Sequence, residues 1–143
     1  MMEDILDSSL REMAAAVRSN QITSVALVQG FIDRIAQVNS ALNAVVSINT
    51  EMALKQAAKA DSDLKEGHIH GPLHGIPMTI KDSLDTKDMV TTWGTKGRET
   101  FRPGRDATCV SRLRAAGAIL LGKTNTPEFT LSFQTDNLVY GRT

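Results

Sequence analysis

The feature that most constrains the fold is a helical segment that ends at a glycine and continues directly into a short apolar run. The run AILL, residues 118–121, follows Gly117 and the segment ATCVSRLRAAG, in which Val110 and Leu113 lie on one helical face. Four apolar residues in a row are typical of a strand buried on both faces. We therefore expect a helix after Asp106 as its cap, a left-handed glycine at its end, and a buried strand.

An upstream segment predicts the strand that pairs with this one. In IPMTIKD, residues 76–82, the apolar residues Ile76, Met78 and Ile80 alternate with others, as in a strand. The order strand, helix, strand predicts a parallel pair joined by a right-handed crossover. The weakly periodic segment between Asp85 and Arg105 is expected to be a long loop that is functional or packed on other parts of the chain.

The first 67 residues predict the order α-α-β-α. A capping box, Ser9 to Glu12, starts the first helix, and Thr23 or Ser24 can cap the second. The β-branched run NAVVSIN predicts a strand, and the segment after it is rich in helix formers up to a glycine at position 67. The sequence thus indicates an α/β chain with a mainly helical part, 1–67, and a βαβ part, 68–143.

A literal phosphate-loop pattern, G-x-x-x-x-G-K-[ST], spans Gly117 to Thr124. A true phosphate loop follows a strand and opens a helix, so that its unpaired N–H groups can point at phosphate. Here a helix comes first and the four middle residues are sheet formers. We therefore interpret the pattern as a helix cap, a strand at 118–121 and an exit from the strand at 122–125, and we expect no nucleotide.

Composition excludes several partners. Sixteen basic and sixteen acidic residues cancel, which gives no support for nucleic acid or a membrane surface as a partner. No apolar run approaches the length of a membrane span, and the acidic start lacks the apolar core of a secretory signal. A single cysteine, Cys109, fits a reducing compartment, so we expect a cytoplasmic location.

Histidine and cysteine offer weaker candidate sites. His68, His70 and His74 form H-x-H-x3-H, but no further ligand completes an obvious metal set, and partly exposed loop histidines are the preferred interpretation. Cys109 falls in the first turn of its helix without an identifiable histidine partner, and a small packed residue is preferred there. We expect neither a metal nor another cofactor.

Lys81 is the strongest candidate from the residues themselves. It ends a strand that we expect to be central, and ligand sites in parallel α/β sheets lie at such ends. Partial desolvation disfavours the charged form of a lysine, and a neutral lysine can act as a general base. The alternative is a lysine paired with Asp82 or another acid at the strand end.

Several motifs occur together in order. They are Gly71-Pro72-Leu73-x-Gly75-Ile76-Pro77, Ile80-Lys81-Asp82, the pair Thr91-Thr92, and Gly122-Lys123-Thr124-Asn125. With this combination the chain resembles the amidase signature family, closely in its second half and less specifically in its helical first half. The resemblance implies a mixed sheet flanked by helices, of which these residues would form an incomplete, N-terminal part of a single domain, 1–143.

The resemblance also implies a mechanism. Family members hydrolyse amides with a Ser–cis-Ser–Lys triad, and Lys81 aligns with the triad lysine. Thr130 and Ser132 fall in a segment that runs beside the family's active site, which implies contact with a small amide substrate. The family's GGSSGG and later GGS segments, which supply the serines, do not occur in these 143 residues. We therefore expect the chain alone to be inactive.

Two alternatives to a free amidase remain. One is the amidase-type subunit of a tRNA-dependent amidotransferase, which hydrolyses the amide of glutamine. The other is a non-catalytic piece that acts through binding or self-association, because an incomplete domain leaves sheet edges and apolar faces uncovered. On that ground we expect a homo-oligomer.

Overall fold

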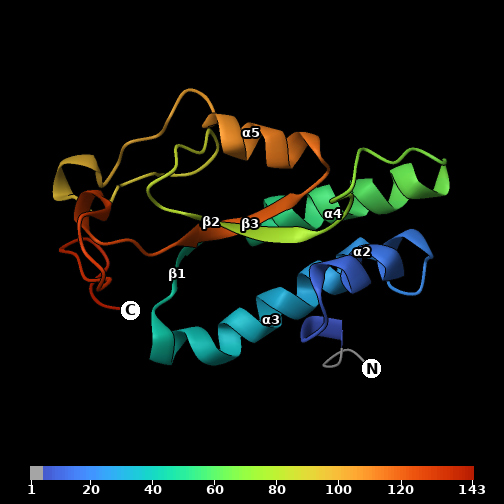
Figure 1. Ribbon diagram of the computed structural model, residues 1–143, viewed down its shortest axis with the longest axis horizontal. Coiled ribbons are helices and arrows are strands. Elements are labelled where there is room, and N and C mark those ends of the chain that lie inside the picture. The colour runs from blue at the N-terminus through green and yellow to red at the C-terminus, as the bar shows by residue number, and fades with distance from the viewer. Residues whose placement is uncertain (1–4) are drawn as a thin grey trace. The chain divides into compact units, whose positions relative to one another are not determined.

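The computed structural model describes residues 5–143 (Figure 1). These residues form two compact units. The first comprises the described residues up to Ile35, with Asn49–Met78 and Leu113–Leu121, and the second comprises Ala36–Ile48, Thr79–Arg112 and Gly122–Thr143. The elements, in order, are α2 (Leu10–Arg18), α3 (Ser24–Leu42), β1 (Val45–Ile48), α4 (Thr50–Lys65), β2 (Pro77–Lys81), η1 (Lys96–Arg98), α5 (Thr108–Ala115), β3 (Ile119–Thr124) and η2 (Glu128–Thr130). The predicted mixed α/β class is confirmed.

Helix α2 begins as its sequence requires. The Ser9 hydroxyl accepts from the Glu12 N–H, and the Glu12 carboxylate accepts from the Ser9 N–H at 2.8 Å, so the predicted capping box is present. Met13 and Val17 on the buried side of the helix cluster with Leu27 of α3 and with Ile76. This cluster is the first half of the core of the first unit.

The second half of that core lies between α3, α4 and the start of β3. Ala53, Ala57 and Ala60 occupy one face of α4 and are buried against Val28, while Ile119 and Leu121 of β3 complete the cluster. Alanine at these positions lets the α4 backbone approach the strand closely. The helix-former pattern of residues 50–65 therefore has a packing function besides its helix propensity.

Gly117 confirms the helix-to-strand junction from which the fold was predicted. Its φ is +94°, and a Cβ at this position would lie 2.7 Å from the Cα of His74. The strand after it is longer than expected, because β3 continues through Gly122 and Lys123 to Thr124. The expected exit from the strand at 122–125 is thus wrong for residues 122–124, which belong to β3, and only residue 125 lies beyond the strand.

The strands form a sheet in the order β1-β3-β2. β3 pairs antiparallel with β1 through Val45↔Thr124 and Ile48↔Gly122. On its other side, the Ile119 N–H donates to the Ile76 carbonyl and the Asp82 N–H donates to the Thr124 carbonyl, both at 2.8 Å. β2 and β3 therefore run parallel, as the strand–helix–strand order predicted. In the described sheet β3 is central and β2 is at the edge, so the expectation that Lys81 ends a central strand is wrong.

Three asparagines fix the segment that follows β3 in the second unit. Asn125 donates to the Gly141 carbonyl and the Thr143 hydroxyl, and Asn43 donates to the carbonyls of Tyr140 and Arg142. The buried Asn137 side chain donates to the Asn125 side chain at 2.8 Å. Side-chain amides thus replace sheet hydrogen bonds in this irregular segment.

Within the described residues no helix is both long and apolar enough to cross a bilayer.

Candidate active site

Lys81 is the last residue of β2 and its side chain is partly exposed. Its neighbours Ile80 and Asp82 are buried, so the pleat places the Lys81 side chain on the opposite face of the strand. Within residues 5–143 its ammonium makes no ion pair and no hydrogen bond, whereas its backbone carbonyl accepts from the Leu84 N–H at 3.0 Å. The alternative of an ion pair with Asp82 is therefore not realised, and the ammonium remains available to another group.

Asp82 is fully buried and is held through its backbone and one of its two carboxylate oxygens. One carboxylate oxygen accepts from both the N–H and the hydroxyl of Thr92, at 3.0 and 2.5 Å. Its backbone carbonyl accepts from the Trp93 N–H at 3.1 Å. The other carboxylate oxygen has no hydrogen bond within the described residues and lies 3.7 Å from the Lys123 ammonium. Asp82 thus joins the end of β2 to the Thr91-Thr92 motif.

Lys123, the lysine of the phosphate-loop pattern, is completely buried in β3. Its ammonium donates three hydrogen bonds, to the Leu84 carbonyl (2.6 Å) and to the hydroxyls of Thr86 (2.9 Å) and Thr91 (3.0 Å). All three of its donors are therefore satisfied by the loop that follows Lys81. We call Lys123, Asp82, Leu84, Thr86 and Thr91 the lysine clamp.

Burial dominates the acid–base properties of the clamp. It lowers the pKa of Lys123 to about 8, although the negative charge of Asp82 opposes this shift. Burial likewise raises the pKa of the Asp82 carboxyl, against the hydrogen bonds from Thr92 and the charge of Lys123. Burial thus acts against the charged form of each group, while the opposite charge of the other group and the neutral hydrogen-bond partners act in its favour.

The loop after the Thr91-Thr92 motif turns sharply at Trp93, whose φ is +56°. This unfavourable backbone conformation is stabilised at both ends, because the Trp93 N–H bonds Asp82 and its carbonyl accepts from the Phe129 N–H at 2.8 Å. The Arg98 guanidinium lies 3.7 Å from the centre of the indole ring.

A cavity of about 390 Å³ adjoins this turn and is lined by Ser83, Leu84, Asp85, Trp93, Arg105, Asp106, Ala107 and Thr108.

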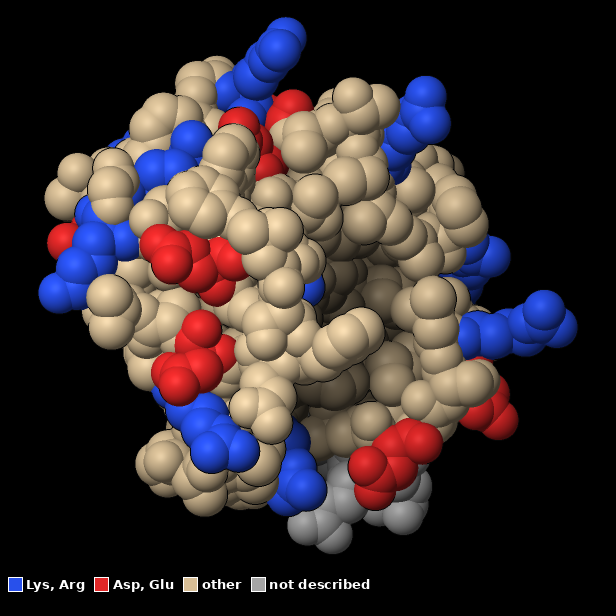
Figure 2. Space-filling view, turned by 60° about the vertical axis from the view of Figure 1, so that its left-hand side comes forward, with Lys and Arg blue, Asp and Glu red and all other residues tan. Residues whose placement is uncertain are grey.

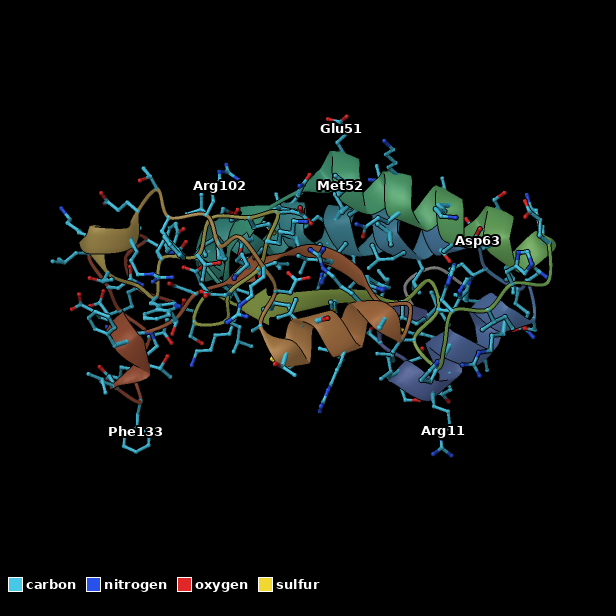
Figure 3. All side chains as sticks on the ribbon, turned by 90° about the horizontal axis from the view of Figure 1, so that it is seen from above. Arg11, Glu51, Met52, Asp63, Arg102 and Phe133 are labelled. Atoms are coloured by element: carbon cyan, nitrogen blue, oxygen red, sulfur yellow. The ribbon has the colours of Figure 1, made fainter. Side chains whose placement is uncertain are left out.

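Thr130 and Ser132, the expected substrate contacts, lie in an exposed stretch of the second unit. The Thr130 hydroxyl is 3.2 Å from that of Thr126, and the Ser132 hydroxyl accepts from the Gln134 N–H at 3.2 Å. No hydrogen bond joins either residue to Lys81 in the described part of the chain. Figure 3 shows the neighbouring Phe133 projecting away from the backbone.

The histidines do not form a metal site. His74 is buried, against expectation, because its ring nitrogens bond the Ala60 carbonyl and the His70 N–H. The exposed His70 ring bonds the Asp63 carboxylate at 2.6 Å. Across residues 5–143 no three potential ligands gather as a metal would require. Cys109, expected to be packed, is exposed.

The lysine clamp is the part of the site that sequence reasoning missed. A signal was available, because Lys123 follows a run of residues typical of a buried strand and could have been expected to continue that strand. A lysine inside a strand of that kind has to be surrounded by acceptors. Thr86 and Thr91 are two of those acceptors. Thr92 bonds Asp82, the acid nearest to the ammonium.

Fold and site together define a class of protein: a mixed α/β chain whose edge strand ends in a lysine without a polar partner among residues 5–143, near a buried Lys–Asp–Thr network. A family model described as Amidase matches residues 26–143. The chain belongs to the amidase family, as the order of its motifs predicted.

Individual relatives agree with this assignment. The chain is 39% identical over 142 residues to a glutamyl-tRNA(Gln) amidotransferase subunit of Thermobifida fusca (strain YX), covering 99% of this chain and 28% of that protein. It is 40% identical to the corresponding subunit of Nocardia farcinica (strain IFM 10152), covering 99% and 29%. The chain thus spans little more than a quarter of the length of these relatives.

Solved structures give the same fold. A peptide amidase from Stenotrophomonas maltophilia superposes with a TM-score of 0.88 and 35% identity, over 96% of this chain and 29% of that one. A fatty acid amide hydrolase superposes with a TM-score of 0.94 and 28% identity, over 99% and 25%. The predicted amidase-type fold is confirmed for these residues.

Proposed function

We propose that the whole protein containing this chain hydrolyses carbon–nitrogen amide bonds, and that Lys81 is its general base. The observation that supports this most directly is the isolation of the Lys81 ammonium. Lys81 ends β2, and its ammonium has no hydrogen-bond or ion-pair partner in the described residues, whereas one carboxylate oxygen of Asp82 beside it is bonded to Thr92. A lysine with a structural role would be expected to have acceptors, as Lys123 does.

In this proposal neutral Lys81 accepts a proton, through one serine, from a second serine that attacks the amide carbonyl. Both serines belong to glycine-rich segments that are absent from these 143 residues. The amine leaves with a proton returned along the same path, and water hydrolyses the acyl-enzyme. Thr130 and Ser132 are proposed to line the substrate site, which their exposure permits.

A chimera tests the role of Lys81. This chain replaces the matched 142-residue stretch of the Thermobifida fusca protein, and glutamine hydrolysis is measured with the recipient's partner subunits. We expect the chimera to be active and Lys81→Ala to lower kcat by about 10² to 10⁴-fold, the usual contribution of a general base.

Lys87→Ala is the matched control, because Lys87 is an exposed lysine six positions further along the same connection. It should leave kcat unchanged. An active chimera whose kcat is the same with lysine or alanine at position 81 would refute the assignment of Lys81 as the base.

A second candidate is favoured by the relatives. Two curated relatives at 39% and 40% identity are amidotransferase subunits, which makes glutamine a candidate substrate and further subunits candidate partners. Figure 2 shows basic and acidic side chains interspersed on the face in view, so that face offers no single-sign patch for tRNA. A glutaminase assay of the whole protein, with and without the partner subunits of a relative, distinguishes an amidotransferase component from a free amidase.

We also propose that the 143-residue chain on its own self-associates, with a second copy as the partner. Leu131, Phe133 and Leu138 are 79% exposed or more, and they lie within eight residues of one another in the second unit. Sedimentation at tens of micromolar should show a dimer or larger species. Replacing Phe133 by serine should shift it toward monomer, and a wild-type chain that sediments as a folded monomer would exclude the idea.

A further inference from the structure

We propose that Lys123 is a positioning residue for Lys81: its buried ammonium, through the lysine clamp, sets where the Lys81 side chain points. The inference rests on the proposed function for its biological meaning. The geometry that supports it lies entirely within the second unit.

Two hydrogen bonds connect the two lysines. The Lys123 ammonium donates to the Leu84 carbonyl at 2.6 Å, and the Leu84 N–H donates to the Lys81 carbonyl at 3.0 Å. The turn of residues 81–84 is therefore closed at one end by its own backbone and held at the other end by Lys123. Losing the ammonium would release the far end of this turn.

Asp82 supplies a second connection. Its N–H donates to Thr124, next to Lys123 in β3, and its carboxylate oxygen lies 3.7 Å from the Lys123 ammonium. The backbone on the C-terminal side of Lys81 is thus bound on both the sheet side and the loop side. The backbone at this strand end is therefore fixed, and with it the direction in which the Lys81 Cα–Cβ bond leaves the strand.

The Lys81 ammonium has no polar restraint of its own in the described residues. It forms no hydrogen bond or ion pair there, so the direction of the side chain depends on the backbone of β2 and on the turn. Since Ile80 and Asp82 are buried and Asp82 lies near Lys123, Lys81 lies on the face away from the clamp. The effect of Lys123 on Lys81 is therefore transmitted through the backbone.

Competitive acetylation of the 143-residue chain measures this effect without any need for catalysis. Trace acetic anhydride labels each lysine amine in proportion to its accessibility and basicity, and peptide mass spectrometry reports each site separately. We expect Lys123→Met to raise labelling of Lys81 by about threefold or more, because the released turn exposes the amine. The exposed Lys55 and Lys65 of α4 serve as internal references and should not change.

Two further variants separate positioning from general loss of stability. Thr86→Val removes one acceptor of the Lys123 ammonium and should cause a smaller rise at Lys81 in a chain that still folds. Val110→Ala removes a buried side chain of the same unit that forms none of the clamp's hydrogen bonds, and should not raise Lys81 above the reference lysines.

Equal changes at Lys81 and at the references in both clamp variants would overturn the proposal. A selective rise in Val110→Ala equal to that in Thr86→Val would do the same. A rise at Lys81 together with full activity of the Lys81→Ala chimera would instead retain the positioning and reject the proposed base.

Discussion

Replacing Lys123 by methionine should destabilise the fold substantially, because it leaves Asp82 as an unpaired charge in the interior. Both side chains of this pair are completely buried, 3.7 Å apart. Removing one partner of a buried pair typically costs about 3 to 5 kcal/mol. Asp82 keeps its two bonds from Thr92, so we place the cost near the lower end, about 3 kcal/mol.

A double-mutant cycle shows whether the orphaned charge is the cause. Asp82→Asn alone leaves Lys123 with its three neutral acceptors and should cost about 1 to 2 kcal/mol. In the double variant no charge remains unpaired, so the total loss should be smaller than the sum of the two by about 1 to 3 kcal/mol. The sign of this coupling follows directly from the pair being buried.

Urea unfolding followed by tryptophan fluorescence is the assay. Trp93 is the only tryptophan of the chain, and its backbone N–H bonds Asp82, so it reports on the affected unit. Lys87→Met, an exposed lysine changed in the same way, should stay within about 0.5 kcal/mol of wild type. Losses that add within about 0.5 kcal/mol, or a Lys123→Met cost below about 1 kcal/mol, would refute the reasoning.

Three further predictions concern packing and pH. Gly122→Ala should cost about 2 kcal/mol in urea unfolding, because its Cβ would overlap the Ser47 carbonyl oxygen, whereas Gly104→Ala, in open space, should be neutral. Since the folded pKa of Lys123, about 8, is below the unfolded value, the unfolded chain binds this proton more tightly. The stability of wild type relative to the Lys123→Met variant should therefore rise as the pH increases from about 8 to about 10.4, and a flat difference would contradict this. The pKa of Asp63 is lowered to about 2, mainly by the hydrogen bond from His70 and then by that from Lys59. The ionised Asp63 carboxylate therefore stabilises the fold above about pH 4, and this stabilisation is lost toward pH 2. The difference in unfolding free energy between wild type and Asp63→Asn should shrink over that range.

Local signals predicted most elements of the chain. The capping box at Ser9, the left-handed Gly117 and the β-branched run at Val45–Ile48 each depend on interactions among near neighbours in sequence, and each is confirmed. The length of β3 was underestimated because Gly122 and Lys123 are poor strand formers by composition. They are strand residues because β1 and β2 pair with them from either side.

The same distinction between local sequence signals and tertiary contacts applies to the candidate site. The sequence by itself selected Lys81, from its place at a strand end within an ordered set of motifs, and the same motifs determined the amidase family. Only the tertiary structure decided which lysine is structural. Lys123 meets acceptors 32 to 39 positions away in sequence, and no local pattern encodes such contacts. The need to satisfy a buried ammonium is a property of the packed interior, whereas helix caps and strand alternation are properties of the neighbouring chain.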